Sequence, residues 1–125
     1  MALTAAGINF IASAITGGGT FFNSSTAHIG VGNGSATFST THTDLTGSSK
    51  LRKAVDAGYP IISPPSLTFC ATFGRDEANF DWNEWAIFNA KTGGVMLNRA
   101  VEYNGTKQDN QTWVLEVVVT FTVNS

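Results

Sequence analysis

The chain is poor in cysteine, proline and charge. Cys70 is the single cysteine in 125 residues, so an intrachain disulfide is excluded. The seven basic residues are dispersed and are outnumbered by nine acidic ones. The electrostatic footprint that phosphate binding needs is therefore missing, and we expect no nucleic-acid partner. Charged residues make up 13% of the chain, against about a quarter in typical globular domains. Such a weakly charged, polar surface suits a protein that packs against neighbours.

Long hydrophobic runs are also missing. No segment approaches the ~20 apolar residues that span a bilayer. The apolar stretch from Leu3 to Ile15 is not preceded by the basic residues of a signal peptide. The sequence therefore predicts a soluble protein, made in a cytoplasm and without a membrane partner. At this length about two thirds of the unfolded chain's surface can be buried on folding, so we expect one β-rich domain over residues 1–125.

One short helix is predicted at the start of the chain. Ile8, Ile11 and Ile15 recur at helical spacing, and Thr4 stands where an N-cap residue accepts a hydrogen bond. The glycines at positions 17–19 end the helix because consecutive glycines favour a turn.

Most of the remaining chain has strand patterns. Residues 66–74 alternate between apolar and polar side chains, which predicts a sheet with one dry face and Cys70 on the more polar face. Further strands are predicted at 27–31 and at 80–89, the latter with a bulge near Asn83 or Glu84. Residues 80–89 and 95–102 form a predicted hairpin. Residues 113–123 carry β-branched side chains on both faces, which favours a central strand.

These elements together predict an α+β, β-rich fold: a short helix followed by a mainly antiparallel sheet or sandwich. Residues 51–62 are compatible with a strand or with an initial helical turn. The strand patterns place four aromatic side chains in the core, namely Trp82, Trp113, Phe69 and Phe121.

The segment between Gly32 and Ser49 predicts a long loop, because Phe38 and Leu45 are nearly its only apolar residues. Loops of this length without regular structure are uncommon unless they bind something. An equally valid interpretation is a solvated excursion pinned by those two side chains. The candidate interface residues are Gly32, Asn33, Gly34, Phe38, Thr41 and Trp85.

Two charges fall within apolar strand patterns. Glu84 lies between two tryptophans, and Arg99 lies in the apolar phase of the next strand. A charge in such a position must be paired, or its desolvation costs several kcal/mol. We therefore predict a structural ion pair between Glu84 and Arg99 that fixes the register of the hairpin.

Patterns that would indicate catalysis or metal binding are weak. His28 and His42 lack other ligands at zinc-site spacing, and the acidic residues at 76, 77, 81 and 84 do not match a calcium-binding loop. The glycines at 30–34 lack the following helix of a phosphate site and indicate a turn. We expect no cofactor, no metal and no enzymatic activity. Trp85 is the main basis for a possible carbohydrate-binding surface.

Several residue blocks resemble small structural proteins of tailed-bacteriophage virions. The opening helix and the block AHIGVGNG at 27–34 are similar to the start of phage tail-collar fibre proteins. The strand EWAIFN at 84–89 is similar to their E-x-G-L-F strand, with Ala86 in place of the glycine. Further blocks that carry the resemblance lie at 43–47, 50–53, 67–74, 77–89, 94–99 and 105–107.

The resemblance implies a virion component of the tail or tail fibre, located in the particle, that acts through assembly with other virion proteins and forms a homo-oligomer. A protein that decorates the capsid is the alternative, and a carbohydrate-binding module that contacts the host surface is a further one. In a symmetric assembly, repeated weak contacts add up through avidity.

Overall fold

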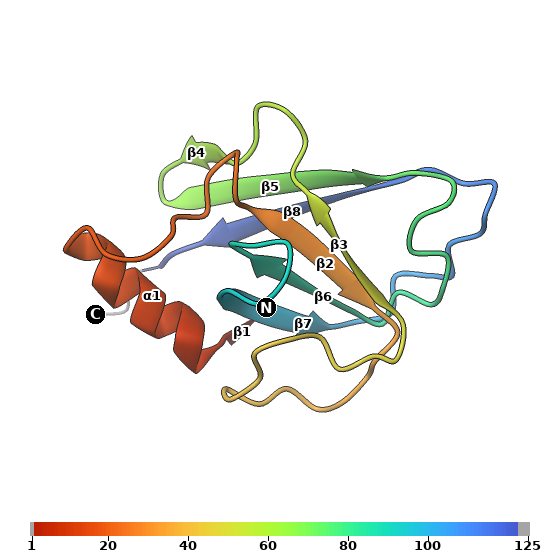
Figure 1. Cartoon of the computed structure of the whole chain (residues 1–125), viewed down its shortest axis with the longest axis horizontal. Helices are drawn as coiled ribbons and strands as arrows, with labels where there is room; N and C mark the ends of the chain where they lie inside the picture. Colours follow the sequence, from red (N-terminus) through yellow and green to blue (C-terminus); the bar gives the residue numbers. More distant parts are fainter. Residues whose placement is uncertain (1, 123–125) are drawn as a thin grey trace.

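The computed structural model describes residues 2–122 (Figure 1). One helix and eight strands are found in this range, and all strand pairs are antiparallel, which confirms the α+β, β-rich prediction. The elements are β1 (Ala2–Leu3), α1 (Ala5–Ile15), β2 (His28–Gly32), β3 (Lys50–Ala54), β4 (Ile61–Ser63), β5 (Ser66–Phe73), β6 (Glu84–Phe88), β7 (Met96–Val101) and β8 (Trp113–Thr120). They form a five-stranded sheet in the order β1-β7-β6-β2-β3 and a three-stranded sheet in the order β4-β5-β8.

Helix α1 begins and ends where the sequence predicts. The Thr4 side chain accepts a hydrogen bond from the Gly7 N–H at 2.9 Å, as an N-cap residue does. The helix ends at Ile15, and Gly17 follows with a φ of 84°, a conformation that favours glycine. Thr4 also donates its hydroxyl to the carbonyl of Met96, which attaches the start of α1 to β7.

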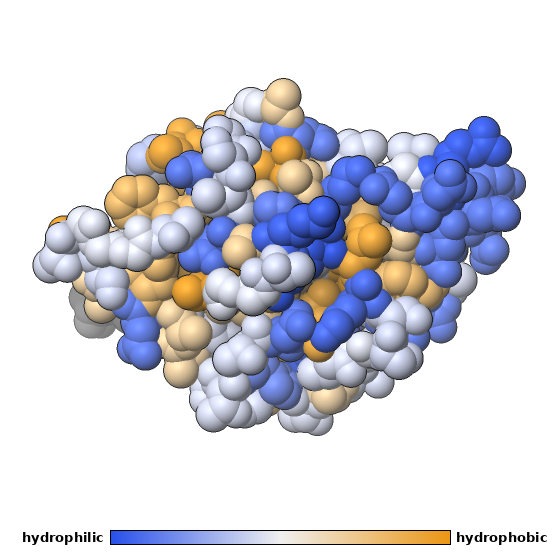
Figure 2. Space-filling model, in the orientation of Figure 1, coloured by the Kyte–Doolittle hydropathy of each residue, from blue (hydrophilic) through white to orange (hydrophobic). Residues whose placement is uncertain are grey.

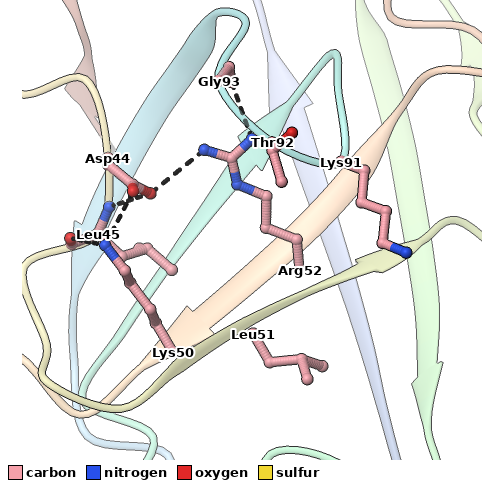
Figure 3. A pocket seen from close by; sticks show the side chains of 8 residues that line it. All are labelled: Asp44, Leu45, Lys50, Leu51, Arg52, Lys91, Thr92 and Gly93. Atoms are coloured by element: carbon pink, nitrogen blue, oxygen red, sulfur yellow. Dashed lines mark hydrogen bonds and ion pairs between the residues drawn. The ribbon is translucent and has the colours of Figure 1, made fainter.

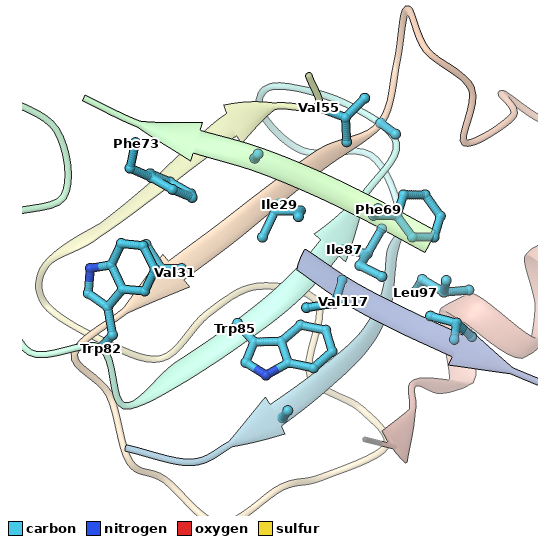
Figure 4. Packing of buried hydrophobic residues seen from close by; sticks show 14 of the residues in the cluster. Ile29, Val31, Val55, Phe69, Phe73, Trp82, Trp85, Ile87, Leu97 and Val117 are labelled. Carbon is cyan, nitrogen blue, oxygen red and sulfur yellow. The ribbon is translucent and has the colours of Figure 1, made fainter. Parts of the chain in front are cut away.

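The core lies between the two sheets (Figure 4). Phe69 and Trp82 are buried, as predicted, and the Trp82 ring meets the Phe73 and Trp113 rings edge to face at 4.9 and 5.0 Å. Trp113 is half-buried against this core. The main cluster is completed by residues of β2, β5, β6, β7 and β8, including Ile29, Val31, Ala71, Trp85, Ile87, Leu97, Val117 and Val119.

The prediction that residues 113–123 form a central strand is wrong. Among the described strands, β8 pairs with β5 alone and is an edge strand of the three-stranded sheet. Its outward-facing Val114 and Val118 are exposed, because none of the described residues forms a second layer over that face. The strand ends at Thr120, so Phe121 lies past its end and is 42% exposed rather than in the core. Val123, which the predicted strand included, lies outside the described residues.

The predicted bulge is wrong in position. Strand β6 starts at Glu84, and the register shift falls further along, where Ile87 pairs with Asn98 but Phe88 pairs with Met96. Leu97 is the extra residue, and it packs in the main core. The extra residue reverses the alternation of side chains along β7. Arg99 therefore lies on the same face of the sheet as its partner Ala86, whereas Leu97 lies on the opposite face.

Two glycines predicted to form a turn lie inside a strand. Gly30 and Gly32 belong to β2, and only the chain after Gly32 leaves the sheet. A Cβ atom at Gly30 would lie 2.7 Å from the Phe88 ring, so the aromatic side chain occupies that space. The segment 51–62, for which a strand and an initial helical turn were both compatible, forms most of β3, a turn and the start of β4.

Cys70 lies on the polar face of β5, as predicted, but it is buried. The chain after β3 covers this face, and the Asp56 carboxylate there accepts hydrogen bonds from the Thr72 N–H at 3.1 Å and hydroxyl at 2.7 Å. Burial and the nearby Asp56 carboxylate raise the pKa of the Cys70 thiol.

Candidate functional site

The long loop between β2 and β3 is fastened at both ends to one carboxylate. Glu84, at the start of β6, accepts hydrogen bonds from the backbone N–H groups of Gly34 at 3.1 Å, Thr46 at 3.0 Å and Gly47 at 2.8 Å. These donors come from the first and last parts of the loop. One buried side chain therefore draws the two ends together.

Arg99 completes this network from β7. Its Nε donates to Glu84 Oε1 at 2.8 Å, and both side chains are fully buried. The two remaining guanidinium nitrogens donate to the Ala36 carbonyl at 2.9 Å and the Thr46 hydroxyl at 3.0 Å. The structure thus contains the ion pair that the sequence predicts. The two residues lie diagonally, because Glu84 pairs with Val101 and Arg99 with Ala86.

The loop ends can approach this closely because they carry glycine. A Cβ atom at Gly34 would lie 2.4 Å from the Gly47 nitrogen, and one at Gly47 would lie 2.6 Å from the Gly34 nitrogen. Asn33 adds a bond to the loop end by accepting from the Ser49 N–H at 3.0 Å. The sequence prediction paired Glu84 with Arg99 alone. It did not include the backbone N–H groups of Thr46 and Gly47, which also donate to Glu84.

The ionised state of Glu84 is favoured in the folded protein. Burial alone would raise its pKa, but the N–H groups of Thr46 and Gly47 and the Arg99 guanidinium outweigh burial and hold the pKa below its usual value. A carboxyl group with a lowered pKa stabilises the fold at pH values above its unfolded pKa. That contribution is lost as the pH falls through the folded pKa.

We therefore expect the thermal unfolding midpoint to fall as the pH is lowered below about 4.3, the ordinary pKa of glutamate. The loss is smaller in Glu84→Gln, which has no such carboxyl to protonate. Circular dichroism melts of both proteins across this pH range measure the difference. Equal acid sensitivity in the two proteins would assign the effect to Asp44 and Glu77, whose pKa values are also lowered.

The candidate interface residues are not all available for contact. Gly32 is buried in β2, whereas Asn33 and Gly34 are partly buried in the fastened loop end. Phe38 is half-buried and Leu45 is buried. These two side chains attach the loop to the protein, which agrees with the second interpretation of the sequence. Thr41 is exposed. The middle of the loop is also attached, because the Ala36 carbonyl accepts from Arg99 at 2.9 Å and the Thr40 carbonyl accepts from the Ala5 N–H at 2.9 Å.

Trp85 is not part of an exposed surface. It is 6% exposed and packs in the main core, with its Nε1 donating to Glu102 Oε1 at 2.7 Å. The strand pattern misled here because all five residues of β6 are buried, so both faces of this strand are covered. Trp85 therefore cannot serve as a platform for sugar stacking.

Strand β8 combines a free edge with exposed apolar side chains. In the described chain, no backbone group of β8 bonds to a strand other than β5. On its outward face Val114 is 61% and Val118 is 54% exposed. Beyond the strand end, Phe121 lines a hollow of about 210 Å³ together with Ile62, Pro64, Pro65, Ser66 and Leu67.

Hydrophobic residues gather at one end of the molecule. Figure 2 shows them over the end that carries β4 and α1, whereas hydrophilic residues cover the opposite end, where β7 connects to β8. Ile61, Ile62 and Ile15 are 47%, 72% and 83% exposed, and they belong to the apolar end. An apolar surface of this kind marks a contact site more often than a solvated one.

The histidines take part in local hydrogen bonds. His28 Nδ1 lies 2.8 Å from the Thr26 carbonyl, and His42 Nδ1 accepts from the Ser39 N–H at 3.2 Å. Within residues 2–122, no group of three potential metal ligands gathers at one point. The one helix in this range is not long and apolar enough to cross a membrane.

Comparison with known proteins adds no relative: no family model, no curated protein and no solved structure matches this chain.

Proposed function

We propose that this protein is a structural component of a bacteriophage virion, part of the tail or tail fibre, and that it acts by assembling with other copies of itself and with other virion proteins. The resemblance of its residue blocks to tail-collar fibre proteins supports the phage context. The unpaired edge of β8 is the observation that supports assembly.

An uncovered edge strand is a template for another strand. Natural proteins blunt such edges with lysine, proline, bulges or a covering element. Strand β8 contains no lysine or proline and pairs with β5 without a register shift over eight residues. Within residues 2–122 it has no neighbouring strand on its other side. It therefore offers free N–H and C=O groups beside exposed valines, which suits strand addition by a partner.

A second copy of β8 fits this edge. In an antiparallel pair of two β8 strands with Val118 opposite Val118 of the second copy, the core-facing side chains of both strands lie on the same face of the joined sheet. Glu116 then meets Thr120, and Leu115 meets the exposed Phe121. The two Glu116 carboxylates stand four residues apart, about 13 Å at strand spacing, which exceeds the screening length of about 8 Å. A register with Glu116 opposite itself would place like charges together and is disfavoured.

Val118→Lys is expected to abolish self-association while the protein stays folded, because the side chain is exposed in the isolated chain and a central lysine pair repels at the new interface. Sedimentation velocity over a concentration series measures the association. The matched control is Val101→Lys, another exposed strand valine, which lies on β7 in the other sheet. A wild type that stays monomeric at high concentration, or equal association of both variants, would contradict the β8 dimer.

Particle location tests the virion assignment separately. Cryo-electron microscopy of the particle is expected to place density for this protein at the tail, in few copies as judged by quantitative mass spectrometry. Density repeated over the icosahedral head would instead identify a capsid decoration protein. Absence from purified particles would overturn the assignment.

A further inference from the structure

The dipeptide Asn-Gly occurs twice in the chain, at residues 33–34 and 104–105. In this dipeptide the backbone nitrogen of the glycine can attack the side-chain amide carbon of the asparagine, because glycine has no Cβ atom to hinder the approach. The attack closes a cyclic imide and releases ammonia. The two copies have the same local chemistry, so only the surrounding structure can make their reactivity differ.

The reacting groups of the second copy are free. Asn104 lies in the segment that joins β7 to β8, at the hydrophilic end of the molecule (Figures 1 and 2), and it is exposed. Among the described residues, none forms a hydrogen bond with its side chain, with its carbonyl or with the Gly105 N–H. The peptide group between the two residues is therefore not held in place.

The fold nevertheless requires glycine at this position. The Asn104 N–H donates to the Trp82 carbonyl at 2.8 Å, and the Gly105 carbonyl accepts from the Trp82 N–H at 2.8 Å. Gly105 has a φ of 112°, and a Cβ atom there would lie 3.1 Å from the Trp113 ring. The turn thus keeps an unhindered backbone nitrogen next to Asn104.

The first copy is held on both sides of its peptide group. The Asn33 carbonyl accepts from Asn83 Nδ2 at 2.9 Å, and the Gly34 N–H donates to Glu84 Oε2 at 3.1 Å. Asn33 Oδ1 also accepts from the Ser49 N–H at 3.0 Å. Attack by the Gly34 nitrogen requires these bonds to break, and the bond to a carboxylate is a strong one.

We propose that Asn104 is a site of spontaneous deamidation in the folded protein, and that the fastened loop end protects Asn33. The Gly105 nitrogen forms a bond to Asn104 Cγ, the Cγ–Nδ2 bond breaks, and Nδ2 leaves as ammonia with the proton of the Gly105 nitrogen. Water then adds to either imide carbonyl and breaks its C–N bond. The inference is independent of the virion assignment and of the β8 edge.

Both products change the surface of the hydrophilic end. Each adds one carboxylate to a chain whose net charge is -2. Water that adds to the side-chain carbonyl gives aspartate, whereas water that adds to the main-chain carbonyl gives isoaspartate, whose backbone is longer by one methylene. The added length falls between the two hydrogen bonds to Trp82, so the isoaspartate product weakens at least one of them.

The test is peptide mapping by mass spectrometry after incubation in mildly alkaline buffer, with and without urea. Trypsin releases residues 100–107, in which Asn104 is the single asparagine. In the folded protein this peptide is expected to gain about one dalton, as an amide becomes a carboxylate. Asn33, located by fragmentation of peptide 1–50, is expected to react about tenfold more slowly or less, since a bond to a charged group must first open.

Urea provides the matched control, because both sites are expected to react at similar rates in the unfolded chain. A sample digested without incubation corrects for reaction during digestion. No mass gain at Asn104 in the folded protein would overturn the proposal. Equal rates at Asn33 and Asn104 in the folded protein would overturn it as well.

Two variants separate the site from its protected counterpart. Asn104→Gln is expected to lose the mass gain, because the longer side chain closes a larger ring slowly, and a gain that persists would contradict the assignment. Glu84→Gln is expected to raise the rate at Asn33 severalfold, since a neutral amide accepts from Gly34 more weakly than a carboxylate does. Asn104 is the internal control and keeps its rate. An unchanged rate at Asn33, or an equal rise at both sites, would contradict local protection.

Discussion

Arg99→Met is expected to destabilise the protein by about 3–5 kcal/mol, because it leaves the Glu84 carboxylate buried without its counter-charge. Both side chains are fully buried and 2.8 Å apart, so water cannot replace the lost partner without opening the loop. The bonds from Arg99 to Ala36 and Thr46 are lost as well. Urea unfolding followed by tryptophan fluorescence measures the change in free energy.

A surface ion pair provides the control for this prediction. Lys50→Met removes one of the two cationic partners of Asp44, in a pair whose side chains are both 43% exposed, and we expect a loss below about 1 kcal/mol. In Arg99→Met the amides of Thr46 and Gly47 should also exchange with solvent faster, because the carboxylate that holds them loses its anchor. Unchanged stability in Arg99→Met would contradict the structural role of the pair.

Replacing both partners does not restore stability in this network. In many proteins a buried ion pair can be exchanged for apolar residues at no cost. Here Glu84 also accepts from three backbone N–H groups, which would lose their acceptor. We therefore expect the Glu84→Met, Arg99→Met double variant to remain well below wild type, with exposure of the loop between β2 and β3.

Gly7→Ala is expected to destabilise the protein by about 1–3 kcal/mol, the usual cost of overpacking. Helix propensity alone predicts the opposite sign, a gain of about 1 kcal/mol for alanine inside a helix. A Cβ atom at this position would lie 2.3 Å from the Leu97 carbonyl oxygen and 2.9 Å from its carbon. Both are backbone atoms of β7, so no side-chain rotation relieves the contact.

An exposed position on the same helix isolates the propensity effect. Asn9→Ala lies on the solvent side of α1 and is expected to stabilise the protein by about 0.5 kcal/mol. Thermal melts of the two variants compare the signs directly. A stabilising Gly7→Ala would show that α1 does not pack against β7 as closely as described.

The sequence by itself determined helix α1, strand β5 and the buried ion pair of this protein. The bounds of α1 follow from Thr4 and the glycines after Ile15, and the alternating pattern of β5 follows from a period of two, because both signals act within a few residues. The pairing of Glu84 with Arg99 was predictable because a charge in an apolar strand requires a partner.

Only the tertiary structure decided which surfaces are free. Trp85 and Val118 both lie in apolar strand patterns, yet the first is buried between layers and the second stands on an open edge. Lys50 and Lys91 line one hollow although they belong to segments far apart in the chain (Figure 3). The physical reason is that periodicity records the conformation of a segment, whereas burial and site formation depend on which distant segments pack against it.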